Sequence, residues 1–180
     1  MHARVKGCHD FFVYNLYTIF ANTTKACYLC TAIQRYIRFQ KNIQHMKYIF
    51  ELPFKVRDYE CDLQGIVNNA NYQHYTEHTR HEFLLSRGVS FAQLHERGID
   101  AVVSGMQLRF KTPLRSGDEF VSRLALRKEG IKYVFVQDIY RLPDERAVLK
   151  STVEAVCVIN GKLGDCEELN RIVEESTATE

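Results

Sequence analysis

The clearest pattern in the chain is an alternation of apolar and polar positions that begins at Tyr48. Apolar residues occupy every second position as far as Val56, and charged residues such as Glu51 and Lys55 fall between them. A period of two residues is typical of a β-strand with one buried face. The sequence therefore predicts that the first strand starts immediately after Met46.

A helical pattern follows the polar stretch 58–71. Leu84 and Leu85 lie off its main stripe, so the predicted helix of about 17 residues is covered on more than one side. Gly88 is a natural C-terminal cap for it. The apolar positions that recur every three or four residues are Tyr72, Tyr75, Thr79 and Phe83.

The rest of the chain predicts one short helix and then only strands. Ser90-Phe-Ala-Gln93 is typical of a capping box, and the helix it opens is expected to stop at Gly98. Asn160-Gly161 is a hairpin-turn dipeptide. This order predicts an α+β fold, in which an antiparallel sheet packs on one dominant helix. The four expected strands cover about residues 106–110, 120–127, 133–140 and 147–159.

Composition narrows the picture to one globular domain. The 180 residues are 46% hydrophobic and 26% charged, with a net charge of +2. Residues 1–45 hold six Lys or Arg against Asp10 alone, which leaves 18 basic and 21 acidic residues in the remainder. A mildly acidic folded part argues against nucleic-acid binding, which needs a basic surface. We expect a domain at 46–173, a tail at 174–180, and an extension at 1–45 that is dispensable or, alternatively, a targeting segment.

The apolar stretch 11–20 and the cysteines add little chemistry. Ten residues are too few to span a bilayer, which takes about 20. The six cysteines show no disulfide framework. Cys27 and Cys30 have CxxC spacing but lack further zinc ligands, so unpaired thiols in a reducing compartment are the simpler interpretation. The expected location is cytoplasmic, without a membrane span.

The segment with the most chemical information leads from the first strand into the long helix. It reads Val56-Arg-Asp-Tyr-Glu-Cys-Asp-Leu-Gln-Gly-Ile-Val-Asn-Asn-Ala-Asn-Tyr72, and Glu77 and Arg80 follow on the helix. Over about residues 47–165 the chain resembles the 4-hydroxybenzoyl-CoA thioesterase family of hotdog enzymes. The resemblance implies a hotdog fold, an antiparallel β-sheet wrapped around one long central helix.

The resemblance also implies a catalytic pair. Asp62 matches the catalytic carboxylate of the family, as nucleophile toward the thioester carbonyl or as general base for water. The backbone N–H of Asn69 matches the donor that polarises that carbonyl, as an oxyanion hole does. Some relatives carry His or Tyr at the position of Asn69, and Asn68 replaces a common aromatic, so substrate preference does not transfer. A purely structural Asp62, which caps the helix or holds the loop, is the alternative.

The same segment supplies the residues expected to contact substrate. Gly65 suits a bend with positive φ that brings loop and helix close to a ligand. Asparagines also cap helix N-termini, so at least one of those at 68, 69 and 71 is expected to do so. The substrate-binding set is Gly65, Val67, Asn68 and Tyr72.

Metal and cofactor chemistry are not expected. His74, His78 and His81 lie on neighbouring helical turns, but no HExxH motif or suitably spaced carboxylate completes a metal site. Neither a nucleotide-binding glycine loop nor a GxSxG motif is present, which removes the serine-hydrolase route. Glu77 and Arg80 are expected to pair with each other or across a subunit interface.

The predicted function is therefore hydrolysis of an acyl-CoA thioester, with an acyl-carrier-protein thioester also possible. Unpaired edge strands and the resemblance both predict a homodimer or homotetramer. Two alternatives are a non-enzymatic acyl-CoA-binding hotdog protein and a hotdog dehydratase, although the latter needs a histidine that this loop lacks. Candidates for contact with the CoA phosphates are Arg127, Lys128 and Lys132.

Overall fold

The computed structural model describes residues 47–177. The predicted extension at 1–45, the apolar stretch 11–20 and the CxxC cysteines lie outside the described residues and stay predictions. The predicted domain end at Val173 falls inside a helix that continues to Thr177.

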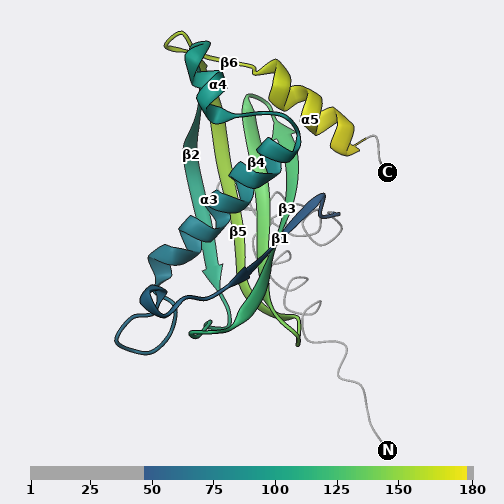
Figure 1. Cartoon of the computed structure of the whole chain (residues 1–180). Coiled ribbons are helices and arrows are strands. Elements are labelled where there is room, and N and C mark those ends of the chain that lie inside the picture. The colour runs from purple at the N-terminus through teal and green to yellow at the C-terminus, as the bar shows by residue number, and fades with distance from the viewer. Residues whose placement is uncertain (1–46, 178–180) are drawn as a thin grey trace, which may run out of the picture. The chain divides into compact units, whose positions relative to one another are not determined.

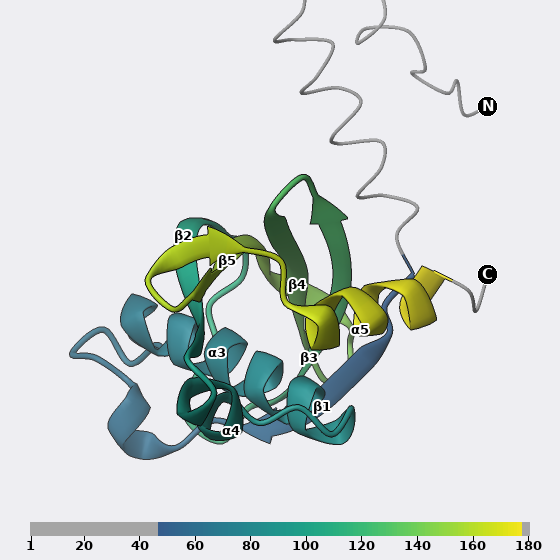
Figure 2. The same ribbon diagram turned by 90° about the horizontal axis from the view of Figure 1, so that it is seen from above.

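The described residues form one curved antiparallel sheet and a long helix that crosses its inner side (Figures 1 and 2). The strand order is β1-β3-β4-β5-β2, and β6 pairs with β5. The predicted α+β architecture of a sheet wrapped around one dominant helix is confirmed. In chain order the elements are β1 (Phe50–Lys55), η1 (Asp58–Glu60), α3 (Asn69–Ser86), α4 (Phe91–Glu96), β2 (Ile99–Phe110), β3 (Glu119–Glu129), β4 (Lys132–Arg141), β5 (Arg146–Ile159), β6 (Lys162–Gly164) and α5 (Glu167–Thr177).

Both ends of α3 are closed by hydrogen bonds that its sequence predicts. The side chain of Asn68 accepts from the Ala70 N–H at 3.0 Å, so one of the asparagines does cap the helix. At the other end Gly88 has φ +74°, its N–H donates to Leu85, and the Val89 N–H donates to Leu84. This pair of bonds is a Schellman motif, which fixes where α3 ends.

Three local predictions need correction. Ser90 precedes α4 as expected, but its side chain makes no capping hydrogen bond, so the capping box is wrong. β2 is longer than predicted and has a bulge between Val103 and Gly105, and its apolar residues Met106 and Phe110 are exposed because β2 is an edge strand. The sequence predicts only strands after α4, whereas the structure has the helix α5 near the C-terminus. Its buried residues Leu169 and Ile172 form only a short apolar stripe among charged neighbours.

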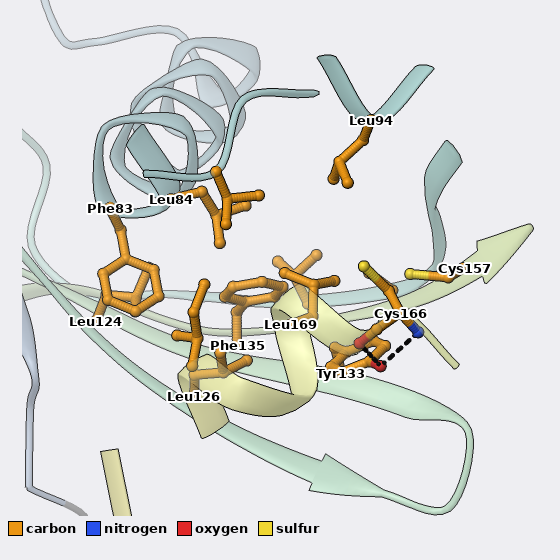
Figure 3. Packing of buried hydrophobic residues seen from close by; sticks show 14 residues of the cluster. Phe83, Leu84, Leu94, Leu124, Leu126, Tyr133, Phe135, Cys157, Cys166 and Leu169 are labelled. Carbon is orange, nitrogen blue, oxygen red and sulfur yellow. Dashed lines mark hydrogen bonds between the residues drawn. The ribbon is translucent and has the colours of Figure 1, made fainter. Parts of the chain in front are cut away.

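The core consists of two apolar clusters, one at each end of α3. The cluster near the start of α3 includes Tyr72, Tyr75 and Leu114. The cluster near its end joins Phe83 and Leu84 to residues of the sheet, α4 and α5 (Figure 3).

A buried polar layer lies between these clusters. Gln137 on β4 accepts from Arg80 at 2.9 Å and donates to the carbonyl of Thr76 at 2.8 Å. Ser151 on β5 donates to the carbonyl of Gln137 at 2.7 Å. The two ends of α3 therefore have separate apolar surroundings.

Candidate active site

The segment between β1 and α3 folds into a tight loop that places Asp62 beside the helix start. Cys61 and Val67 form a single antiparallel bridge. Within it the Asp62 N–H donates to Ile66 at 2.9 Å, and the Gly65 N–H donates to the carbonyl of Asp62 at 3.0 Å. Gly65 has φ +70°, so the predicted bend with positive φ is confirmed.

The Asp62 carboxylate is held by one oxygen and open at the other. Oδ1 accepts from the backbone N–H of Gln64 at 2.8 Å. Oδ2 makes no hydrogen bond with residues 47–177, and the side chain is partly exposed. A carboxylate oriented in this way can accept a proton from water or attack an electrophilic carbon.

The first turn of α3 leaves one backbone donor unused. The N–H of Asn68 donates to the carbonyl of Glu60 at 2.9 Å, that of Ala70 to the Asn68 side chain, and that of Asn71 to the carbonyl of Asn68 at 3.0 Å. The N–H of Asn69 has no partner within the described part of the chain. It lies at the positive end of the helix dipole, where negative charge is stabilised.

Sequence reasoning missed the residue that ties this loop to the helix. Glu60 is buried, and its carbonyl accepts both the Asn68 N–H and the Asn71 side-chain amide, the latter at 2.7 Å. Its carboxylate accepts from the Arg57 N–H at 2.7 Å. The signal in the sequence is an acidic residue two positions before Asp62.

The predicted substrate-binding residues lie in two different environments. Gly65 and Asn68 are exposed on the loop. Val67 and Tyr72 are buried, and both bind Leu114: Val67 donates to its carbonyl at 2.8 Å, and the Tyr72 hydroxyl accepts from its N–H at 3.1 Å. Burial raises the pKa of Tyr72. In a single chain these two residues organise the segment after β2, and their contact with substrate stays a prediction.

A cavity of about 440 Å³ lies at the other end of α3, between that helix, α4, β2 and α5. No residue of the Asp62 loop lines it. Its walls are largely apolar, with Leu84, Phe91, Phe135, Ala155 and Leu169 among them.

Arg80 brings a positive charge into this cavity. The residue is only 7% exposed, and burial lowers the pKa of the guanidinium, while the negative charge of Glu77 opposes that shift. No carboxylate among residues 47–177 lies in ion-pair contact with it, so a direct Glu77–Arg80 pair is wrong for a single chain. The physical reason is that Arg80 turns toward Gln137 in the sheet, whereas Glu77 stays exposed.

The histidines of α3 do not converge. His74, His78 and His81 are exposed, and the ring of His81 lies 4.7 Å from that of Phe91. Burial is the main cause of a lowered pKa at His81. In residues 47–177 no group of three or more His, Cys, Asp or Glu side chains is placed to hold a metal ion.

The basic residues suggested for CoA phosphates are engaged in ion pairs around the β3–β4 hairpin. Arg127 pairs with Glu129 at 2.6 Å, Lys128 with Asp165 at 2.9 Å, and Lys132 with Glu154 at 2.6 Å. A phosphate would have to compete with these carboxylates. Their role stays a prediction. Separately, none of the helices within 47–177 is long and apolar enough to cross a membrane.

The curved sheet around α3, with an acidic loop at the helix start, defines the hotdog class of thioesterases. Residues 56–174 match the thioesterase-like superfamily, and the chain belongs to that family.

Named relatives and solved structures agree with this assignment. The chloroplastic acyl-acyl carrier protein thioesterase ATL3 of Arabidopsis thaliana is 37% identical over 116 residues, which are 64% of this chain and 61% of that protein. The chain thus spans less than two thirds of this curated relative. A hypothetical protein from Aquifex aeolicus is 30% identical, with a TM-score of 0.64 over 69% of this chain and 98% of its own. A 1,4-dihydroxy-2-naphthoyl-CoA thioesterase from Synechocystis shares the fold, with a TM-score of 0.67 at 14% identity over 70% and 96% of the two chains.

Proposed function

We propose that this protein hydrolyses an acyl thioester of CoA or of an acyl carrier protein. The observation that carries the proposal is the junction between loop and helix. One oxygen of Asp62 and the N–H of Asn69 have no partner there within residues 47–177, although the residues around them are hydrogen-bonded to one another. A carboxylate and a backbone donor at one helix start are the two groups that thioester cleavage needs.

The chemistry has two possible routes through Asp62. In the first, the carboxylate attacks the carbonyl carbon, the thiol leaves, and water then hydrolyses the mixed anhydride. In the second, Asp62 takes a proton from a water molecule that attacks the same carbon directly. Both routes release a carboxylic acid and a thiol, and in both the Asn69 N–H stabilises the charge that develops on the carbonyl oxygen. Neither route uses a metal or an organic cofactor.

A second copy of the chain completes the site in this proposal. The start of α3 lies beside the end of β2, where the rings of Tyr72 and Phe110 are 5.4 Å apart, whereas the cavity is lined by the beginning of β2. β2 is an edge strand with exposed apolar side chains. If two copies pair through β2 in antiparallel fashion, the Asp62 loop of one copy lies beside the cavity of the other. The cavity then holds the acyl group.

Asp62→Asn tests the catalytic part of the proposal. The variant keeps the size of the side chain but loses its basicity, so kcat/KM for an acyl-CoA is expected to fall by a factor of about 10²–10⁴. Asp58→Asn on the same loop is the matched control and should retain activity. If the wild type cleaves no acyl-CoA or acyl-carrier-protein thioester, the protein is a binding protein or a dehydratase instead. Hydration assays on an enoyl-CoA then separate those two.

Val102→Asp tests the subunit arrangement. Val102 is exposed on β2, and a charge there should prevent pairing of the edge strands. The variant is expected to be monomeric by light scattering and inactive, whereas Leu163→Asp, at a more exposed site on β6, should behave as wild type. A fully active monomer would contradict the composite site. Whether the assembly is a dimer or a tetramer, and whether it is cytoplasmic, remain predictions.

A further inference from the structure

The cavity at the end of α3 carries a polar feature that an aliphatic chain alone does not need. Pockets of some 300–1,000 Å³ with mostly apolar walls are typical small-molecule sites, and their few polar groups select the ligand. Here those polar groups include Arg80, about 16 Å along the helix axis from Asn69. A buried charge is costly unless it is hydrogen-bonded, so its presence in this wall needs an explanation.

Most hydrogen-bonding capacity of Arg80 is unused. A guanidinium has five N–H donors, and among the described residues only Nη1 donates, to Gln137. Its other nitrogens are not among the buried side-chain atoms that lack a partner, so they reach open space. Because Arg80 lines the cavity, that space is where a ligand would lie.

Glu77 supplies the complementary group one helical turn earlier. It also lines the cavity, and it accepts no hydrogen bond from any residue of 47–177. Residues three apart on a helix are neighbours on its surface. The cavity wall therefore offers donors from Arg80 and acceptors from Glu77 on adjacent turns.

These two groups restrict the chemistry of the ligand. Glu77 and Asp100 both line the cavity, and their negative charges disfavour an anionic ligand group, whereas Arg80 disfavours an ammonium. Asp100 is itself paired with His95 at 2.7 Å. A neutral group that both accepts and donates a hydrogen bond fits best, and on an aliphatic chain that group is a hydroxyl.

We propose that the cavity binds an acyl chain that bears a hydroxyl group, which accepts from Arg80 and donates to Glu77. The apolar part of the chain packs against Leu84, Phe135 and Leu169. This inference rests on the proposed function and adds to it a preference for hydroxylated acyl chains. Arg80 and Glu77 are specificity-determining residues in this proposal, and neither takes part in the bond cleavage.

The test compares kcat/KM for hydroxyacyl-CoA and unsubstituted acyl-CoA of equal, medium chain length. The hydroxyl is placed near the thioester, in mid-chain or at the chain end. For at least one position the wild type should prefer the hydroxylated substrate. Arg80→Met should reduce that preference about tenfold or more, because a hydrogen bond to a charged group is lost. Arg87→Met, the same change on α3 outside the cavity, should leave the preference unchanged.

Arg80→Met leaves the buried Gln137 without its donor and could therefore destabilise the fold. Glu77→Gln is a second test that does not carry this risk. Glu77 is exposed and has no such partner. Glu77→Gln should weaken the preference for the hydroxyl but not for a ketone at the same position, because a ketone only accepts. A preference that is absent from the wild type, or unchanged in both variants, overturns the inference.

Calorimetric binding to Asp62→Asn separates this inference from the proposed function. If no thioester is cleaved by the wild type but hydroxyacyl-CoA still binds the variant more tightly than acyl-CoA, the proposed function fails and the binding site stands. If cleavage is efficient and indifferent to the hydroxyl at every position, only the further inference fails.

Discussion

The two ends of α3 differ in almost every property that matters for catalysis. At its start, a partly exposed loop presents a carboxylate and a backbone donor that has no partner among residues 47–177, and none of its residues lines the cavity at the other end. At its end, an apolar cavity of about 440 Å³ is lined by the buried Arg80, and its lining has no carboxylate beside the start of a helix, as Asp62 is. A single chain thus has reactive groups in one place and room for a substrate in another. Antiparallel pairing of two copies is a simple way to bring them together.

The largest effect that separates the two ends is expected from Asn69→Pro. Proline is well tolerated as the first residue of a helix, and Asn68 has φ −59° and ψ 138°, a conformation compatible with a following proline. The change removes the N–H together with the side-chain amide, and loss of the N–H should lower kcat about 10²–10³-fold, or roughly 3 kcal/mol in barrier.

Asn69→Ala is the control for this change, since it keeps the N–H and should keep most of the activity. Steady-state kinetics with one acyl-CoA and circular dichroism of each variant provide the measurement. Equal activity of the proline and alanine variants would mean that the donor lies elsewhere.

Gly88→Ala tests how much the turn that ends α3, at the cavity end of the helix, contributes to stability. A Cβ at Gly88 meets no atom within 4 Å, so its cost comes only from φ +74°. The free energy of unfolding should fall by about 1–2 kcal/mol. Urea titration checks this, with Ser86→Ala as the control on the exposed last turn. If Gly88→Ala lowers the free energy of unfolding but leaves kcat/KM unchanged under conditions where the variant is fully folded, the two ends act independently.

Asn68→Ala probes the stability of the start of α3 rather than its catalysis. Loss of the cap to Ala70 should cost about 1 kcal/mol in the free energy of unfolding, and Asn68→Asp should retain that stability because Asp caps equally well. Thermal unfolding of the three proteins is sufficient. A stable alanine variant would argue that the backbone bonds to Glu60 alone fix the helix start.

The smallest effect is a pH dependence at the start of α5, next to the cavity residue Leu169. Hydrogen bonds from Arg97, the Cys166 thiol and its own backbone N–H lower the pKa of Glu168 to about 2. A depressed carboxyl pKa stabilises the fold above the unfolded value, near 4.3, and this stabilisation is lost as the pH falls toward 2.

Glu168→Gln should therefore lower the free energy of unfolding at pH 7 by about 0.5–1 kcal/mol, the range for a surface pair in which Arg97 is 54% exposed. The difference from wild type should shrink steadily between pH 5 and pH 3. Glu167→Gln, also in the first turn of α5, is the control. A difference that does not change with pH would assign the effect to helix packing.

The sequence predicted most of the regular structure because buried residues recur every two positions in the strands and every three or four positions in α3. β1 alternates as its sequence does, and α3 starts at an asparagine cap and ends at Gly88. The loop of Asp62 was identified only through family resemblance, since a lone aspartate has no distinctive pattern. Its hydrogen bond to Gln64 and the role of Glu60 depend on the folded path of the backbone.

Features that depend on distant segments were not predictable in this way. Arg80 finds its partner in Gln137, 57 residues away along the chain, whereas the sequence suggested its near neighbour Glu77. The cavity arises where α3, α4, β2 and α5 meet, and α5 was not predicted at all. The exposure of β2 was not predictable either: Met106 and Phe110 alternate as the sequence predicts, but they lie on an edge strand and stay exposed.

The bulge at Val103–Gly105 changes the numbering of the β2 residues that turn inward. Before it, the odd-numbered residues Ile99, Ala101 and Val103 line the cavity, and after it the even-numbered Leu108 packs on the cluster around Tyr72. Deleting Ser104 would restore regular alternation and remove the local bend that a bulge gives to a strand. Gain or loss of one residue here is thus a route by which relatives could remodel the acyl chamber while the hydrolytic loop is inherited intact.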